Sequence, residues 1–353
     1  MERSAALAPD LVEELFDAGL FSLLLPHSVG GAETPLPDFI EIVEQLAFGD
    51  ASVAWSLAQA NVFSTHAARL APTAATEIFA GGKTAMVHGP PKTTRAIRVD
   101  GGFRVTGTWG FGTGIAHSAW LAGRCDIEGE KGTYLLVMFP KQRATIIDNW
   151  NVRGLSATGS HDFSVESLFV PTAHTMGAGA ESHHDSPLFH LPVVSMFAVS
   201  FAAVALGTSV MMLDHLLNLA KTKKADHTRH TLAVDPHVHE QVGLARAVWS
   251  AARHYLHGEV ADVWADLQPG EAPTMEHRIR LRLCGTHGLR EARRVADLCW
   301  EMAGTSEIQA GSDFHRRYQD MIVISQHLQA RTAHYPTVGR YTLGDTAKLG
   351  PLV

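Results

Sequence analysis

Cysteine is scarce in this sequence. The 353 residues include only three cysteines, Cys125, Cys284 and Cys299, which are far apart and form no CxxC pair. This spacing argues against a disulfide framework and against a cysteine zinc cluster. The cysteine usage therefore fits a reducing compartment, and we expect a cytoplasmic protein.

Metal-ligand patterns are also missing, although histidine is abundant. The 21 histidines include the pairs His183/His184 and His237/His239. No acidic or thiolate ligand stands at the helical or hairpin spacing that a metal site would need. We therefore predict no metal site.

Clustered charge and targeting segments are lacking as well. The net charge is −7, and the basic residues are dispersed except for Lys221, Lys223 and Lys224, so we expect no nucleic-acid partner. The N-terminus MERSAALAPD has no basic region followed by an apolar core. We expect no apolar run near the ~20 residues that span a bilayer, and hence no membrane association.

What the sequence does have is apolar content and a change of periodicity along its length. Hydrophobic residues make up 46% of the chain, enough for a large core. Helical spacing runs from about Pro9 to Ala80, and short β-branched segments separated by glycine and proline run from about Thr84 to Pro171. We predict an α+β fold with an N-terminal helical domain (1–82), a central β-barrel-like domain (83–175) and a C-terminal four-helix bundle (190–345).

Four long amphipathic segments make up the predicted bundle. They are Ser195–Ala220, Asp235–Leu267, Thr274–Met302 and Asp313 to about Thr332. On the last segment, Arg317, Asp320, Ile324, His327 and Arg331 are spaced by three or four residues. A continuous helix would place these five side chains on one face.

The segment Phe103–Trp120, FRVTGTWGFGTGIAHSAW, predicts two short strands around a turn. Trp109, Phe111 and Thr113 alternate along the first strand, so regular β geometry would place them on the same side. The pattern resembles the flavin-contacting strand of the acyl-CoA dehydrogenase superfamily. The resemblance implies that Phe111 covers the flavin ring and that the Thr113 hydroxyl lies near flavin N5.

Other segments extend this resemblance along nearly the whole chain. They are AGLFSLLLPHSVGGAETPLPDFIEIVEQLAFGDASVAW, WNVRGLSATGSHDFSVESLFVP, WEMAGTSEI and FHRRYQDMIVISQH. The family's Arg-x-x-Arg-Asp stretch matches Arg316 to Asp320, which puts the usual glutamate base at His327 or Leu328. A competing register sets Ala303 at that position. Neither register supplies a carboxylate.

A histidine in this place, within Ser325-Gln326-His327, resembles the group D flavin-dependent monooxygenases, such as 4-hydroxyphenylacetate hydroxylase and dibenzothiophene monooxygenase. The resemblance implies the oxygenase component of a two-component system. Such a component takes reduced FMN or FAD from a separate reductase, uses O2 through a C4a-hydroperoxyflavin and hydroxylates a small aromatic or polycyclic substrate. It also implies a homotetramer.

The same resemblance implies roles for individual residues. His327 would act as the base or hold the distal peroxide oxygen, with Thr113 as the second catalytic group. Asn61, His66 and His327 would line the substrate cavity. The residues expected to bind the flavin are Trp109, Phe111, Gly112, Thr113, Gly114, Gly159, Ser160, Lys223 and Arg229, with the last two serving the phosphate.

Three alternatives remain open from the sequence. A flavoprotein dehydrogenase of the same fold would need an acidic base such as Glu301 or Glu307. An amino-sugar N-oxygenase would share the fold and the flavin chemistry. A non-catalytic flavin-binding oligomer would keep the fold without turnover.

Overall fold

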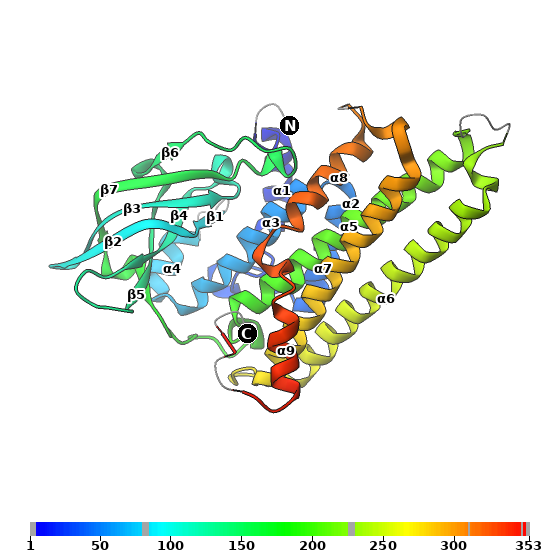
Figure 1. The fold of residues 1–353 in the computed structure, drawn as a ribbon. Coiled ribbons are helices and arrows are strands. Elements are labelled where there is room, and N and C mark those ends of the chain that lie inside the picture. Colours follow the sequence, from blue (N-terminus) through cyan, green and yellow to red (C-terminus); the bar gives the residue numbers. More distant parts are fainter. Residues whose placement is uncertain (1–4, 80–84, 225–229, 310, 347–348, 351–353) are drawn as a thin grey trace.

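The computed structural model describes residues 5–79, 85–224, 230–309, 311–346 and 349–350. Helices at the start of the chain are followed by a β region and then by a long helical bundle (Figure 1). The β region lies at one side of the molecule and the bundle at the other, with α3 between them (Figure 1). This arrangement confirms the predicted α+β class. The predicted domain limits stay predictions.

The N-terminal region contains four α helices in the part of the chain that the structure describes. They are α1 (Pro9–Asp17), α2 (Leu36–Gly49), α3 (Ala51–Ser64) and α4 (Pro72–Phe79). Asp50 separates α2 from α3, because its extended backbone ends one helix and its carboxylate accepts from the N–H groups of Ser52 and Val53. Nearly every residue of α3 is buried, so this helix belongs to the core.

Eight strands form two four-stranded sheets between Met86 and Gly177. One sheet has the order β1 (Met86–Gly89), β4 (Trp120–Asp126), β5 (Tyr134–Pro140), β8 (Thr175–Gly177), and only its β1–β4 pair is parallel. The other is antiparallel, in the order β2 (Pro91–Val99), β3 (Gly102–Gly112), β7 (His161–Pro171), β6 (Thr145–Ile147). Val87, Val137 and Phe163 meet in one apolar core, so the two sheets pack face to face.

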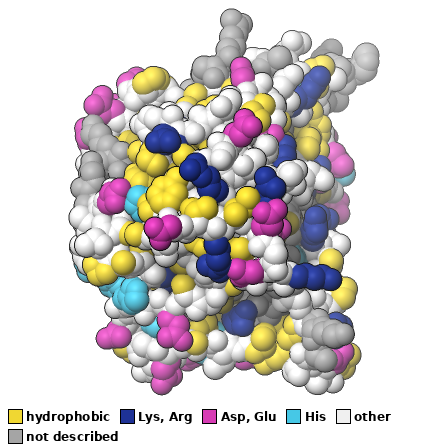
Figure 2. All heavy atoms as spheres, turned by 90° about the vertical axis from the view of Figure 1, so that its left-hand side faces the viewer, with side chains coloured by type: hydrophobic (Ala, Val, Ile, Leu, Met, Phe, Trp, Pro, Cys, Tyr) yellow, Lys and Arg dark blue, Asp and Glu magenta, His cyan; other side chains and the backbone are white. Residues whose placement is uncertain are grey.

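The outward side of the β region is mixed in character. Exposed hydrophobic side chains lie there among lysine, arginine and acidic residues (Figure 2). Ile97, Val99 and Phe169 are among the exposed apolar residues of this region. The side chains that matter for a site lie instead where the β region meets the helices.

The bundle contains α5 (Val193–Thr222), α6 (Pro236–Asp266), α7 (Met275–Ala303), α8 (Asp313–Ile324) and the short α9 (His334–Thr342). Three of the four predicted segments match within three residues. The fourth prediction is wrong at its end, because α8 stops at Ile324 and Ser325 bonds back to the Ile322 carbonyl. His327 therefore lies beyond the helix, and the predicted five-residue helical face does not form.

Helix α5 also corrects an expectation about apolar runs. Its mean hydropathy reaches 2.0 over 18 residues, so by length and composition it could cross a membrane. However, 83% of that window is buried, because α2, α3 and α7 pack around it. Its apolar character is that of a core helix.

Candidate functional site

Three histidines from distant parts of the sequence gather where α3, β1 and the segment after α8 approach each other. We call His66, His88 and His327 the histidine cluster. Aromatic rings connect its members: His88 stacks on Phe63 at 4.4 Å between centroids and on Phe197 at 5.8 Å. Sequence reasoning proposed His66 and His327 but missed His88, because the only local signal was a histidine on a short strand.

His66 and His88 share the ring of Phe63. The centroid of His66 lies 4.4 Å from Phe63, and its Nδ1 lies 2.9 Å from the Phe63 carbonyl oxygen. A carbonyl only accepts, so Nδ1 of His66 carries the proton and Nε2 is left as an acceptor. Nδ1 of His88 lies 3.1 Å from Nε2 of the Gln59 amide, which makes it an acceptor with the proton on the other nitrogen.

His327 precedes a short turn instead of lying on a helix. Its ring meets Trp55 at 5.2 Å and Phe201 at 4.8 Å, edge to face in both cases, while Trp55 and Phe201 stack at 3.9 Å. Its Nδ1 accepts the Gln329 N–H at 3.4 Å. The neutral ring then carries its proton on Nε2 and offers a hydrogen-bond donor there.

A buried cation anchors the turn that carries His327. The Arg282 side chain is fully buried and donates to the Gln329 side chain and to the Val194 carbonyl. Thr286 donates to the Gln329 carbonyl at 3.3 Å. These contacts hold the backbone N–H that faces His327.

All three imidazoles are neutral at pH 7. Burial lowers the pKa of His66 to about 4, of His88 to about 3 and of His327 to about 4. Neighbouring positive charge acts in the same direction, from Arg69 on His66 and from Arg331 and Arg282 on His327. Among the residues that the structure describes, the ring contacts and hydrogen bonds of the three histidines involve no carboxylate, so the cluster presents two donors and one acceptor in an aromatic environment.

The predicted flavin strand ends in a bulge. The β3–β7 register shifts between Trp109 and Gly112, and Phe111 has φ of +56°, a conformation uncommon for a bulky residue. The Phe111 side chain is 59% exposed and its ring meets Trp150 edge to face at 6.1 Å. The expectation that Trp109, Phe111 and Thr113 face the same side is therefore wrong.

Trp109 is a core residue. It is fully buried between the sheets, stacks on Phe163 at 5.4 Å and donates its indole N–H to the Arg124 carbonyl at 2.8 Å. A Cβ on Gly123 would come within 2.5 Å of this indole, so the fit is tight. This placement leaves Trp109 no free face for a flavin and corrects that expectation.

Three hydroxyls form a chain beside the bulge. Ser160 lies 2.8 Å from Thr113 and 2.8 Å from Thr158, and Thr158 donates to the Leu155 carbonyl at 2.8 Å. The chain thus joins two predicted flavin contacts, Thr113 and Ser160, in one network.

The predicted glycines allow close approach at the same place. Gly114 and Gly159 have φ of +79° and +51°. A Cβ on Gly114 would lie 2.8 Å from the His117 ring, and one on Gly112 would lie 2.9 Å from the His161 carbonyl. Their present role is to let the turn close. Contact of these backbones with a flavin stays a prediction.

The bulge and the histidine cluster are connected through β1. The Gly110 N–H donates to the Pro90 carbonyl at 3.0 Å. Pro90 lies two residues after His88. A Cβ on Gly89 would lie 2.6 Å from the Gly110 carbonyl, so the two backbones touch. The exposed Phe111 and the histidines therefore belong to adjoining parts of one junction.

Three further predicted residues lie elsewhere or have structural contacts. The fully buried Asn61 amide bonds to the backbones of Leu20, Leu24 and Leu57, which fastens α3 to the preceding loop. Lys223 donates to the Ala303 carbonyl at 2.5 Å, at the C-terminus of α7. Arg229 lies outside the described residues. The ligand roles of these residues stay predictions.

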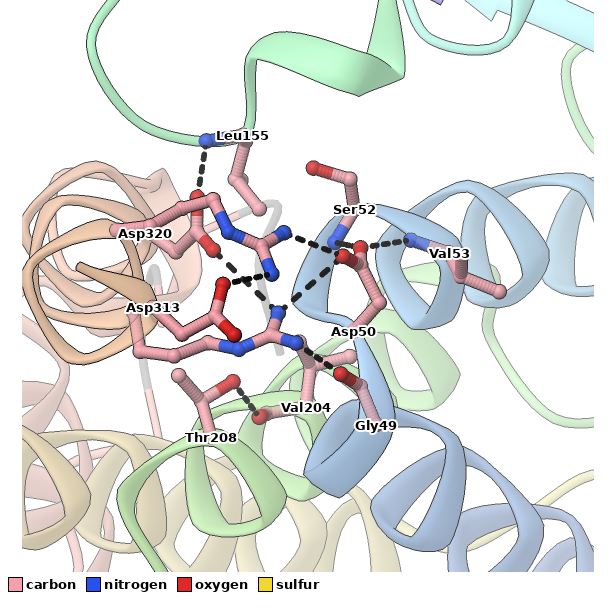
Figure 3. A network of polar contacts seen from close by, with 11 residues as sticks. Gly49, Asp50, Ser52, Val53, Leu155, Val204, Thr208, Asp313 and Asp320 are labelled. Carbon is pink, nitrogen blue, oxygen red and sulfur yellow. Dashed lines mark hydrogen bonds and ion pairs between the residues drawn. The ribbon is translucent and has the colours of Figure 1, made fainter. Parts of the chain in front are cut away.

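An ion network ties α8 to α3 and to the β region (Figure 3). We call Asp50, Arg316, Arg317 and Asp320 the α8 ion network. Arg316 meets Asp50 at 2.7 Å, and Arg317 meets Asp50 at 3.4 Å and Asp320 at 3.7 Å. Arg317 also donates to the Gly49 carbonyl. Burial raises the pKa of Asp320 to about 7.

Comparisons with known proteins agree with this architecture. The family model "Acyl-CoA dehydrogenase, C-terminal domain" matches residues 199–332. An indole-3-acetate monooxygenase from Pseudomonas putida is 27% identical over 350 residues, covering 97% of this chain and 89% of that protein. The oxygenase subunit HsaA of a flavin-dependent monooxygenase from Rhodococcus jostii is 26% identical over 323 residues. The match covers 88% of this chain and 85% of that protein.

A solved structure gives the same result for the fold. XiaF from Streptomyces sp., in complex with FADH2 and glycerol, has a TM-score of 0.90 at 22% identity and covers 97% of this chain and 90% of that chain. Together these findings confirm the resemblance to the acyl-CoA dehydrogenase superfamily and to its flavin-dependent monooxygenases.

Proposed function

We propose that this chain, which has the acyl-CoA dehydrogenase fold, is the oxygenase component of a two-component flavin-dependent monooxygenase. It would use O2 and reduced FMN or FAD to hydroxylate a small aromatic or polycyclic substrate. The relatives named as monooxygenases span nearly the whole chain, which supports this class. The structure adds the arrangement of the side chains.

One observation carries the proposal: three neutral imidazoles line an aromatic environment next to an exposed ring held on a bulge. The rings of Phe63, Phe197 and Phe201 contact the histidine cluster. Apolar surroundings favour an aromatic substrate, while two N–H donors and one acceptor can orient its polar group. The absence of charge on the imidazoles lets them bind without a buried ion.

The residues at the bulge fit a flavin. Phe111 offers an exposed aromatic face, Trp150 stands at its edge, and Thr113 and Ser160 offer hydroxyls that both donate and accept. We infer that these residues hold the flavin ring. A bound reduced flavin would supply the electrons that activate O2, and the protein would supply orientation and exclusion of water.

The hydrogen-bond pattern indicates which histidine donates a proton and which accepts one. Because Nδ1 of His327 is occupied by the Gln329 N–H, we infer that its Nε2–H donates to an oxygen of the substrate or of activated O2. His66 has the opposite tautomer, since its Nδ1 faces a carbonyl, so its Nε2 is the better proton acceptor. This refines the expectation that His327 is the base.

The dehydrogenase alternative needs a carboxylate near the same rings. Glu307 is paired with His215 at 3.1 Å and with Ser312. His215 stands 14 residues after Phe201 on α5, which corresponds to roughly 21 Å along a helix. Glu307 is thus too far from the cluster, and the monooxygenase is the better-supported activity.

Three further features are proposals that follow from the resemblance to known proteins. A relative described as an oxygenase subunit implies a separate flavin reductase for this chain as well. A homotetramer remains the expected assembly, and cytoplasm the expected location. Gel filtration with light scattering would test the homotetramer directly.

The experiment that tests the function is anaerobic mixing of the protein with reduced FMN or FAD, followed by oxygenated buffer. We expect a long-lived transient absorbance near ~380 nm before oxidised flavin appears. A matched control is His254→Ala, an exposed histidine on α6 that should leave the transient unchanged. Immediate formation of oxidised flavin, together with bleaching by acyl-CoA thioesters, would instead favour the dehydrogenase.

A further inference from the structure

We propose that Asp320 is a positioning residue for the flavin site: from α8 it holds the backbone of Leu155 and thereby sets the loop that carries the flavin-facing rings and hydroxyls. The identity of the ligand rests on the proposed function. The contact itself does not, since it is observed in the structure.

The contact joins two parts of the fold that are 165 residues apart in sequence. Oδ1 of Asp320 accepts the Leu155 N–H at 2.6 Å (Figure 3). Asp320 is 3% exposed and Leu155 is also 3% exposed, so water does not replace this bond. A short bond to a buried carboxylate is among the stronger hydrogen bonds in proteins.

Leu155 connects several residues of the loop between β6 and β7 by hydrogen bonds. Its carbonyl accepts the Thr158 hydroxyl at 2.8 Å, the Thr158 N–H at 3.2 Å and the Trp150 indole N–H at 3.3 Å. Its φ is +52°, a strained conformation for leucine. Strain of this kind persists where several contacts define the backbone together, and the Asp320 bond is one of them.

Both branches that leave Leu155 reach the proposed flavin site. Through Thr158, the hydroxyl chain continues to Ser160 and Thr113. Through Trp150, ring contact continues to the exposed Phe111. A shift of Leu155 would therefore move the hydroxyls and the aromatic pair at once.

The loop backbone lies directly on α8. A Cβ on Gly154 would come within 2.1 Å of the Gln319 carbonyl oxygen and 2.7 Å of the Asp320 nitrogen. Only glycine permits this approach. The residue before Leu155 and the carboxylate that holds Leu155 thus form one docking point between the bundle and the β region.

The remaining partners of Asp320 belong to the α8 ion network. Arg317 balances its charge at 3.7 Å, and Arg317 also meets Asp50, which does not contact the loop in any observed hydrogen bond. Asp50 therefore provides a matched control. It shares Arg317 with Asp320, but its side chain is more exposed, at 15% against 5%, and its own backbone bonds go to Ser52 and Val53.

The test compares Asp320→Ala, Asp320→Asn and Asp50→Asn by deuterium exchange of a peptide that covers residues 150–160, and by titration with FMN and FAD. Loss of a buried hydrogen bond predicts about 10-fold faster exchange in Asp320→Ala, with flavin affinity weakened by a similar factor. Asp320→Asn keeps an acceptor oxygen and should restore most of both. Asp50→Asn should leave exchange of this peptide at the wild-type rate.

Two outcomes would overturn the proposal. One is unchanged exchange and unchanged flavin affinity in Asp320→Ala. The other is equal loosening in Asp50→Asn, which would make the effect a general weakening of α8. If Asp320→Ala does not fold, Gly154→Ala provides the second variant, because it pushes the loop off α8 while Asp320 stays, and it should give the same loss.

The failure of the proposed function would look different. In that case the wild-type protein would bind neither flavin, yet the exchange difference between Asp320→Ala and Asp50→Asn would remain. Loss of the exchange difference with normal flavin binding would refute the positioning role alone.

Discussion

The histidine cluster and the α8 ion network are both partly or fully buried groups of titratable side chains, but their polar atoms have different kinds of partner. In the network every carboxylate has an arginine or a backbone N–H within reach, as Asp50 and Asp320 do. In the cluster each ring has one nitrogen bonded to the protein, and aromatic rings surround the rest. The network bonds to its own members and to nearby backbone groups, such as the Leu155 N–H and the Gly49 carbonyl. Each ring of the cluster has one nitrogen bonded to a described residue and a second nitrogen that can meet a ligand.

We infer from this difference that the network mainly positions elements of the fold and that the cluster is the part that meets a ligand. A paired buried charge holds elements together, and removal of one partner leaves the other uncompensated. A buried imidazole without a carboxylate lowers its pKa and stays neutral, at some cost to stability in acid. Groups that bear such a cost without a partner are typical of sites that act on a ligand.

The largest effect is expected from removing a member of the histidine cluster. His327→Ala should reduce hydroxylation roughly 10²–10⁴-fold, because it removes the Nε2–H donor, while the free energy of unfolding changes little. Steady-state turnover with an aromatic substrate measures the activity, and urea unfolding measures the free energy of unfolding. The control is His254→Ala on α6. A loss of stability that accounts for the loss of activity would assign His327 a packing role.

The next largest effect is expected from removing an arginine of the α8 ion network. Arg317→Ala should destabilise the protein by about 3–5 kcal/mol, because it leaves the buried Asp320 without its cation and the Gly49 carbonyl without its donor. Urea unfolding measures this change. Arg316→Ala is the control, since Arg316 is more exposed and should cost clearly less. Equal effects of the two variants would contradict the distinction.

A third prediction concerns pH and the sign of its effect. The folded-state pKa of His88, about 3, lies below its ordinary value of 6.5, so the unfolded chain takes up the proton first. Stability that is present above pH 6.5 is therefore lost as the pH falls, by at most about 2 kcal/mol between pH 6.5 and 5. His88→Asn should lose less over this range in urea titrations.

For Asp320, the stability of the protein is expected to change with pH in the opposite direction. Its folded-state pKa, about 7, lies above the ordinary 3.8, so the folded protein holds the extra proton. Its contribution to stability falls as the pH rises from about 4 to 7. Arg317, Arg316 and Asp50 are the charged groups that act on it. Asp320→Asn should remove this part of the pH dependence, and an unchanged profile would contradict the assignment.

The smallest expected effect concerns the strained ring on the bulge. Phe111→Asn should leave stability unchanged or raise it by up to ~1 kcal/mol, because asparagine tolerates positive φ. Flavin affinity should fall, since the exposed aromatic face is lost. Thermal unfolding and flavin titration measure the two effects. Phe169→Asn, on β7 and 45% exposed, should affect neither strain nor flavin binding.

Local pattern predicted most of the fold. Helical periodicity placed α5, α6 and α7 within three residues of their bounds, and glycine-punctuated β-branched runs located the strands. These features depend on neighbours in sequence, so one chain is enough to read them. The end of α8 was missed, since the spacing of Ile324 and His327 continues a helix that the Ser325 turn interrupts.

The sequence by itself determined the fold class, and its resemblance to known flavoproteins predicted His327 at the base position. Only the tertiary structure decided that His88 joins His66 and His327, that Trp109 is core and that Phe111 turns outward. It also decided that Asp320 reaches Leu155. Burial and hydrogen-bond partners arise from residues far apart in the chain, and it is these contacts that set protonation, strain and exposure.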